Sequence, residues 1–301
     1  MTPTVKATLI GGTAVLMWAT LALFTTLTGR VPPFLLVALA FAVASAMIAV
    51  KWVVCRQNPL SYLRQPWPVW LLGVGGLFGY HFFYFLALRN APPVEAGLIA
   101  YLWPLLIVLF SSLLPGERLR WWHLAGALAG LAGAALLVTG GGKVAFRADH
   151  MLGYLAAVAC AFTWSGYSVL SRFVKSVPTD TVGGFCAASA VLGFACHLIF
   201  EETVLPASAL EWLAVLALGL GPVGLAFFTW DHGVKHGDIK ALGAASYAAP
   251  LLSTILLVLF GMGAATWVLA AACVLIVGGA VLASKDMFAR PAVPPDIAEK
   301  P

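Results

Sequence analysis

Aromatic and hydroxyl-bearing side chains recur at spacings of three and four residues within long apolar segments of the chain. One such stripe carries Trp164, Tyr167 and Ser168, and another carries Ser246 and Tyr247. Residues at these spacings share one face of a helix. Aromatic rings stack on apolar or aromatic side chains, and hydroxyls form hydrogen bonds with polar groups. The stripes therefore indicate reversible binding of a small molecule with both apolar and polar parts.

Two further segments add rings to this set. Tyr80, His81 and Tyr84 fall within an arc of about 100° on one helix, and Trp103 closely follows Tyr101. Small and hydroxylated residues also join membrane helices to one another, and Tyr and Trp also anchor helix ends at the lipid interface, so both interpretations stay open for each residue. The residues expected to line one shared cavity are Tyr80, His81, Tyr84, Tyr101, Trp103, Trp164, Tyr167, Ser168, Ser246 and Tyr247.

Few ionisable residues fall within the apolar segments. His81 is placed to relay a proton or to bind a substrate carboxylate, and a neutral histidine bonded to its neighbours is the alternative. Asp231 and Glu95 lie near the ends of their segments, where each is a candidate for a coupling group, a gate or an interfacial charge. Asp231 and Lys235 also have the spacing of a helix ion pair.

Two prolines, Pro104 and Pro250, lie inside apolar segments. A proline there removes a backbone hydrogen bond, kinks the helix and frees a carbonyl that could meet a substrate. A simple bend of the helix is the alternative. Both prolines are therefore candidates for kink or gating positions.

The sequence lacks the motifs of several other chemistries. It contains no Gly-rich phosphate loop and no G-x-S-x-G elbow, which argues against an enzyme. His232 and His236 have the spacing of metal ligands, but no third ligand is evident. We therefore expect neither a cofactor nor a metal.

The elements that position these residues follow from composition. The 301 residues are 61% hydrophobic and 10% charged, whereas a soluble domain carries about 25% charged residues. This excludes a cytosolic enzyme, a disordered protein and a nucleic-acid binder. Ten segments approach the roughly 20 apolar residues that a membrane helix needs, so we expect an all-α integral membrane protein. The expected spans are 7–28, 34–54, 67–89, 93–114, 121–140, 151–172, 181–200, 209–234, 239–260 and 265–284.

The distribution of basic residues predicts the orientation. With ten spans, both termini lie on the same side of the membrane. If that side is the cytoplasm, most of the 17 Lys and Arg residues lie inside, and only Arg30, Arg89, Lys143 and Arg147 lie outside. This bias follows the positive-inside rule and predicts that both termini are cytoplasmic.

The chain also repeats itself at an offset of 146 residues, which places Trp18 on Trp164, Tyr101 on Tyr247 and Pro104 on Pro250. Each unit holds five spans, and because five is odd, the second unit must be inverted relative to the first. Inverted repeats are typical of secondary transporters, which bind substrate near the midplane between the repeats. We expect repeats over 1–145 and 146–289, followed by a disordered cytoplasmic tail over 290–301.

Several motifs carry a family resemblance. The segment from Pro115 to Leu119, followed by a Gly-rich helix with Gly126, Gly130 and Gly133, resembles the drug/metabolite transporter superfamily of the EamA type. The segments 101–105 and 246–253 are similar to those of bacterial aromatic amino acid exporters within that family. The resemblance implies export of aromatic and other neutral amino acids from cytoplasm to periplasm, with Tyr101, Trp103, Ser246, Tyr247 and Pro250 as the matching motif residues.

The resulting hypothesis is an alternating-access exporter of the inner membrane with a central cavity between the repeats. A transporter of hydrophobic drugs or another small metabolite, and a membrane receptor or scaffold without flux, are the alternatives. The expected partners are the small-molecule substrate and the lipid bilayer, and no nucleic acid. A monomer is slightly favoured, and the Gly126-x-x-x-Gly130 stripe is either a dimer face or internal packing.

Overall fold

The computed structural model describes residues 1–142, 144–259 and 264–288, and every regular element in these ranges is a helix. The expectations for Lys143 and for the tail 290–301 lie outside the described residues. Nine of the described helices are long and apolar enough to cross a membrane. A further apolar helix, Trp267–Ala283, has 17 residues. The chain is therefore an all-helical membrane protein, as its composition predicted.

The spans follow one another with short connections. In the first part of the chain they are α1 (Pro3–Ala19) with α2 (Leu21–Leu27), α3 (Pro33–Val54), α5 (Trp67–Asn90), α6 (Pro93–Ala100) with α7 (Trp103–Ser111), and α8 (Trp121–Thr139). In the second part they are α9 (Met151–Leu170), α10 (Val182–Phe200), α11 (Ala209–Leu220) with α12 (Ala226–His236), and α13 (Ile239–Ala245) with α14 (Ala248–Leu259), and the shorter apolar helix α15 (Trp267–Ala283) follows them. The shorter elements are α4 (Pro59–Leu63), α16 (Lys285–Phe288) and the turns η1 (Ala148–His150), η2 (Ser171–Val174), η3 (Thr179–Thr181) and η4 (Gly221–Leu225).

Two spans are broken at equivalent places. α6 ends at Ala100 before α7 begins, and α13 ends at Ala245 before α14 begins. Pro104 and Pro250 explain these breaks, because proline has no N–H for the carbonyl one turn earlier and its ring crowds that carbonyl. The structure therefore places an interruption directly before each proline that the sequence singled out.

A further break in the eighth span was not expected from the sequence. The turn η4 is a short π-helix between α11 and α12, and it contains Pro222. A Cβ atom at Gly224 would lie 2.0 Å from the carbonyl oxygen of Gly219, so the turn requires glycine at this position. Pro222 and its neighbouring glycines are the signal for this break, because proline has no N–H to continue the hydrogen bonding of the helix and π-turns are a usual site of kinks.

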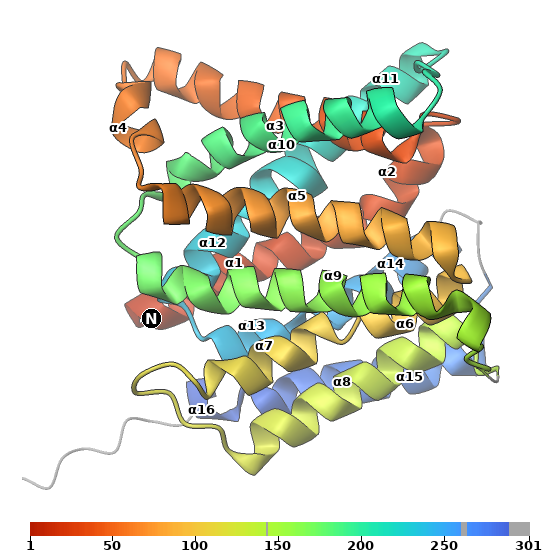
Figure 1. Ribbon diagram of the computed structural model, residues 1–301. Helices are drawn as coiled ribbons and strands as arrows, with labels where there is room; N and C mark the ends of the chain where they lie inside the picture. The colour runs from red at the N-terminus through yellow and green to blue at the C-terminus, as the bar shows by residue number, and fades with distance from the viewer. Residues whose placement is uncertain (143, 260–263, 289–301) are drawn as a thin grey trace, which may run out of the picture.

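Helices from the two parts of the chain interlock. The most extensive contacts pair α8 with α15, α5 with α9, α3 with α10, and α1 with α12. Figure 1 shows these pairs running roughly side by side, with α4, α16 and the N-terminus at one end and α2 at the other. Each half therefore buries its apolar surface mainly against the other half.

Glycines permit the closest of these approaches. A Cβ at Gly126 would lie 2.4 Å from the carbonyl oxygen of Gly279, and a Cβ at Gly130 would lie 2.5 Å from the ring of Tyr247. The Gly126-x-x-x-Gly130 stripe thus packs within the chain against α15 and against Tyr247 at the break between α13 and α14. Of the two alternatives that the sequence left open for this stripe, the structure shows internal packing.

Candidate functional site

Four tryptophans meet between the two halves of the chain. Trp18 of α1, Trp103 of α7, Trp164 of α9 and Trp230 of α12 form the tryptophan cluster. Every pair among the four has ring centroids between 5.0 Å and 6.3 Å apart. Two come from the first half of the chain and two from the second. The cluster is therefore built only when the halves interlock.

Sequence reasoning selected Trp103 and Trp164 but missed Trp18 and Trp230. Trp18 carried a signal, because the internal repeat places it on Trp164. Trp230 also carried a signal, because Phe227 lies three residues earlier and so shares its helix face. Its position facing the other three rings follows from the tertiary packing of α12 against α1.

Hydrogen bonds hold two of the indoles in place. Trp18 Nε1 donates to the carbonyl oxygen of Pro222 at 3.1 Å, and Trp230 Nε1 donates to Ser168 Oγ at 3.0 Å. The first acceptor lies in the π-turn η4, so the break that the sequence did not predict supplies the carbonyl that orients Trp18. The predicted site residue Ser168 is buried and orients Trp230.

The predicted residues of α5 extend the cluster along one wall. The Tyr80 ring lies 5.6 Å from Trp164 and is stacked on Tyr84 at 6.1 Å. His81 lies 6.2 Å from Phe227, which in turn lies 5.5 Å from Trp164. His81 Nδ1 lies 2.7 Å from the carbonyl oxygen of Leu77, and because a carbonyl can only accept, this nitrogen is the donor. The remaining ring nitrogen is thereby left as the acceptor in the neutral histidine.

The predicted tyrosine of the ninth span, Tyr247, does not belong to the tryptophan cluster. Tyr247 is fully buried against α8 and α15, outside the tryptophan cluster. Its hydroxyl accepts a hydrogen bond from the backbone N–H of Leu105 at 3.1 Å. That N–H lies in the first turn of α7, where the helix offers no internal acceptor. Tyr247 therefore caps the broken span of the first half, whereas its counterpart Tyr101 is half-buried at the break itself.

Ser246 lies at the corresponding break between α13 and α14. Its buried hydroxyl donates to the carbonyl oxygen of Leu242 at 2.8 Å. The bond is local to α13, so the Ser246 hydroxyl pairs with a carbonyl oxygen in the last turn of that helix.

Asp231 closes one end of the cluster with a buried ion pair. The Asp231 carboxylate lies 2.9 Å from Lys235 Nζ, which confirms the pair that their spacing predicted. The same carboxylate accepts bonds from Thr179 Oγ1 at 2.8 Å and from Tyr167 OH at 3.4 Å. Lys235 also donates to the carbonyl oxygen of Val177 at 3.0 Å. A cavity of about 10 Å³ beside this network is large enough for no more than one water.

Other charged groups at the same end form ion pairs between the two halves. Glu117 lies 2.5 Å from Lys240 and 3.7 Å from Arg172. Arg172 also donates to the carbonyl oxygen of Gly237 at 2.6 Å. Lys51 and Asp180 form a separate pair at 2.6 Å. We call this end, with its three ion-paired groups around Asp231, Glu117 and Asp180, the ion-paired end.

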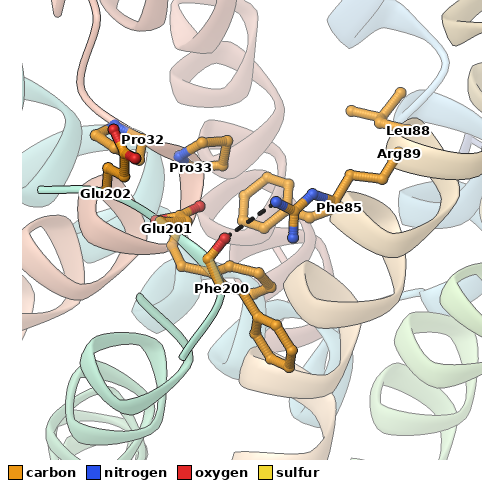
Figure 2. A pocket seen from close by; sticks show the side chains of 9 residues that line it. Pro32, Pro33, Phe85, Leu88, Arg89, Phe200, Glu201 and Glu202 are labelled. Carbon is orange, nitrogen blue, oxygen red and sulfur yellow. Dashed lines mark hydrogen bonds between the residues drawn. The ribbon is translucent and has the colours of Figure 1, made fainter. Parts of the chain in front are cut away.

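The opposite end contains the larger cavity. Here Glu95 accepts a hydrogen bond from the hydroxyl of Tyr154, which links α6 to α9. A pocket of about 360 Å³ lies where α3 begins and where α5 and α10 end, and Figure 2 shows it from close by. We call it the α3–α5–α10 pocket, and its lining residues are Pro32, Pro33, Phe34, Phe85, Leu88, Arg89, Phe200, Glu201 and Glu202.

The arrangement of these side chains is suited to binding a small molecule rather than to catalysing a reaction. The cluster offers aromatic faces and edges, which bind apolar and cationic groups. In the described ranges, no group of three His, Cys, Asp or Glu side chains is placed to hold a metal ion. The rings of His232 and His236 lie 5.0 Å apart, and no third possible metal ligand joins them among the described residues.

Comparison with known proteins agrees with this arrangement. The model of the EamA-like transporter family matches the chain twice, over residues 6–139 and 151–285. The aromatic amino acid exporter YddG of Ancylobacter novellus is 60% identical over 280 residues, which cover 93% of this chain and 97% of that protein. The protein of the same name from Salmonella typhimurium is 28% identical over 83% of this chain and 87% of its own length.

Relatives that match a smaller part of the chain are named for other cargo, and a solved structure shares the fold. The pseudopaline exporter CntI of Pseudomonas aeruginosa is 29% identical over 64% of this chain and 66% of that protein. A crystal structure with 59% sequence identity superimposes with a TM-score of 0.88, covering 93% of this chain and 98% of that one. The chain therefore belongs to the EamA-like transporter family, and it is a multi-span membrane transporter rather than an enzyme.

Proposed function

We propose that this transporter exports aromatic and other neutral amino acids from the cytoplasm to the periplasm. The tryptophan cluster carries the proposal. Four indoles from both halves of the chain converge on one point, where they offer faces for an aromatic or apolar side chain. The 60% identical relative, an aromatic amino acid exporter, supports the same substrate class.

Transport proceeds by alternating access between two inverted five-helix repeats, 1–145 and 146–289. Two observations support this part of the proposal. The family model matches twice within one chain, and the breaks before Pro104 and Pro250 fall at equivalent places in the two matches. The rings of the cluster also contact one another, so a substrate can enter between them only if helices of the two halves move apart.

The orientation places both termini and the ion-paired end in the cytoplasm, with ten spans crossing the inner membrane. The charge bias of the sequence supports it. Under this orientation the Glu117 group and the Lys51–Asp180 pair, which join the two halves, form the cytoplasmic gate, and Asp231 lies beside it, paired with Lys235 within α12. Glu95 and the α3–α5–α10 pocket lie on the periplasmic side.

The test is transport by purified protein in liposomes. We expect uptake of labelled phenylalanine, threonine and methionine, with phenylalanine competing against the other two. Trp164→Ala should reduce transport at least about fivefold, because loss of one central aromatic contact removes on the order of 1–3 kcal/mol of binding. Trp67→Ala is the matched control, since Trp67 is 74% exposed and lies outside the cluster.

The outcomes separate the alternatives. Full transport by the Trp164→Ala protein would exclude the cluster as the binding site. Transport of hydrophobic drugs or of another metabolite that amino acids never inhibit would overturn the substrate assignment, and the relatives with other cargo make that panel necessary. Binding without flux would indicate a receptor or scaffold.

A further inference from the structure

We propose that the α3–α5–α10 pocket is a second binding site, which holds the zwitterionic amino acid as it leaves the protein. This inference rests on the proposed function for its substrate class and on the proposed orientation for its direction. The pocket volume of about 360 Å³ falls in the range of about 300–1,000 Å³ that is usual for small-molecule sites. It therefore has room for one aromatic amino acid.

The pocket offers one cationic group that is available to a ligand. Arg89, in the last turn of α5, is exposed and donates from Nη2 to the carbonyl oxygen of Phe200 at 3.1 Å. Figure 2 shows the guanidinium reaching across the pocket toward that carbonyl, which fixes its position. A guanidinium has five N–H donors and matches the geometry of a carboxylate. Arg89 is thus placed to bind the carboxylate of the substrate.

The helix N-terminus in the pocket is already occupied, which leaves the carboxylate to Arg89. Glu201 accepts hydrogen bonds from the backbone N–H groups of Phe34 at 2.9 Å and Leu35 at 3.2 Å, in the first turn of α3. His197 Nδ1 lies 3.0 Å from the same carboxylate. Glu201 therefore holds the wall of the pocket in place and is not free to bind a ligand.

A second carboxylate is free to receive the ammonium group. Glu202 is exposed, and among the described residues it has no ion-pair partner within 4.0 Å. Figure 2 shows Glu202 and Arg89 on opposite sides of the pocket. The rim thus presents opposite charges at two places, which complements the ammonium and carboxylate of a neutral amino acid.

Aromatic rings connect this pocket to the tryptophan cluster. Phe34 and Phe85 pack edge to face at 5.2 Å in the pocket wall. Phe85 lies 6.3 Å from His81, and His81 lies 5.4 Å from Tyr80, which contacts Trp164. An apolar side chain that leaves the cluster along α5 therefore meets rings at each step until it reaches the pocket.

Binding measurements on the purified full-length protein test the site. The probes are L-phenylalanine, phenethylamine, which lacks the carboxylate, and 3-phenylpropionate, which lacks the ammonium. In a Trp164→Ala background, we expect Arg89→Gln to weaken L-phenylalanine and 3-phenylpropionate about tenfold, because a charge-assisted hydrogen bond is lost. Phenethylamine should be unaffected. Glu202→Gln should weaken L-phenylalanine and phenethylamine and leave 3-phenylpropionate unchanged.

The matched control is Arg30→Gln, because Arg30 is an exposed arginine in the loop before α3 and does not line the pocket. Equal binding by the Arg89→Gln and Arg30→Gln proteins would overturn the site. The second measurement needs no Trp164 variant. In liposomes, Arg89→Gln should raise the half-saturating concentration of L-phenylalanine on the side of the pocket and leave that on the opposite side unchanged, and equal values on both sides would also overturn it.

Failure of this inference and failure of the proposed function give different results. If wild-type protein carries no amino acid, the proposed function is wrong whatever the pocket binds. If wild-type protein transports phenylalanine and the Arg89→Gln and Glu202→Gln variants match the Arg30→Gln control in every assay, only the second site is wrong.

Discussion

The two ends of the molecule close in different ways. At the ion-paired end, Glu117 pairs with Lys240 and Arg172 across the two halves, and Lys51 pairs with Asp180. The cavity beside the Asp231–Lys235 pair, which lies within α12, has a volume of about 10 Å³. At the other end, hydrogen bonds join the halves, and none of the ion pairs among the described residues does so there: Tyr154 donates to Glu95, the N–H groups of Phe34 and Leu35 donate to Glu201, and Arg89 donates to the carbonyl of Phe200. The α3–α5–α10 pocket at this end has a volume of about 360 Å³. The same apolar helices run through both ends, so the difference lies in the few polar residues at their tips.

This difference indicates that the ion-paired end resists opening more strongly than the end with the pocket. Opening the ion-paired end separates Glu117 from Lys240 and Arg172, which are charges of opposite sign, whereas the hydrogen bonds that join the halves at the other end each have only one charged partner. The ion-paired end should therefore open only when its charges reach water or new partners together. The end with the pocket can open at a lower cost in free energy.

The largest effect is expected for Asp231→Asn. This change leaves Lys235, whose side chain is 3% exposed, as an uncompensated buried charge. Loss of one partner of such a pair destabilises a protein by about 3–5 kcal/mol. The thermal unfolding temperature in detergent should fall clearly below that of wild type. The double variant Asp231→Asn with Lys235→Met should recover most of the loss, and a single variant as stable as wild type would contradict the role assigned to this pair.

A smaller effect is expected for Glu117→Gln. Lys240 and Arg172 both lose their carboxylate partner, at a cost of about 1.5–3 kcal/mol for hydrogen bonds to a charged group. The loss should shift the protein toward opening at the ion-paired end. The native Cys186 reports this opening, because it is buried and follows Phe185, which lines the small cavity there.

The measurement for Glu117→Gln is the alkylation rate of Cys186, followed by peptide mass spectrometry. We expect a faster rate than in wild type. The exposed Cys55 serves as the internal control, since its rate should not change. An unchanged Cys186 rate would show that the Glu117 group does not hold this end closed.

The smallest effect is expected for Tyr154→Phe at the opposite end. The change removes the hydroxyl that donates to the Glu95 carboxylate, which is one hydrogen bond to a charged group and contributes at most about 1.5–3 kcal/mol. Glu117→Gln removes the charged partner of two groups, so its effect is larger. Thermal unfolding should shift only slightly, and the alkylation rate of Cys186 should stay at the wild-type value. A rise in that rate equal to the rise in Glu117→Gln would remove the distinction between the two ends.

Much of the fold was predictable because hydropathy is a local property. The apolar runs predicted the spans, and the breaks before Pro104 and Pro250 followed from the missing N–H of proline. The π-turn at Pro222 was not predicted. Its effect on the helix depends on how Gly219 and Gly224 pack in the turn.

The candidate site was predictable only in part. Trp103 and Trp164 were selected, and the repeat offset links Trp18 to Trp164. Trp230 joins them only because α12 packs against α1. Tyr101 and Tyr247 occupy equivalent positions in the sequence, yet only Tyr247 is buried against α8, where Gly130 leaves room for its ring and Leu105 donates to its hydroxyl.

The sequence by itself determined the membrane class, the positions of nine apolar spans, the match of each half to the same family model and the residue types available for binding. These follow from composition and from distances along the chain. The tertiary structure decided which rings meet, which charges pair across the halves and where a cavity remains. Those depend on the rotation and tilt of each helix against its neighbours, because a residue's face on an almost uniformly apolar helix is set by packing and not by its hydrophobic pattern.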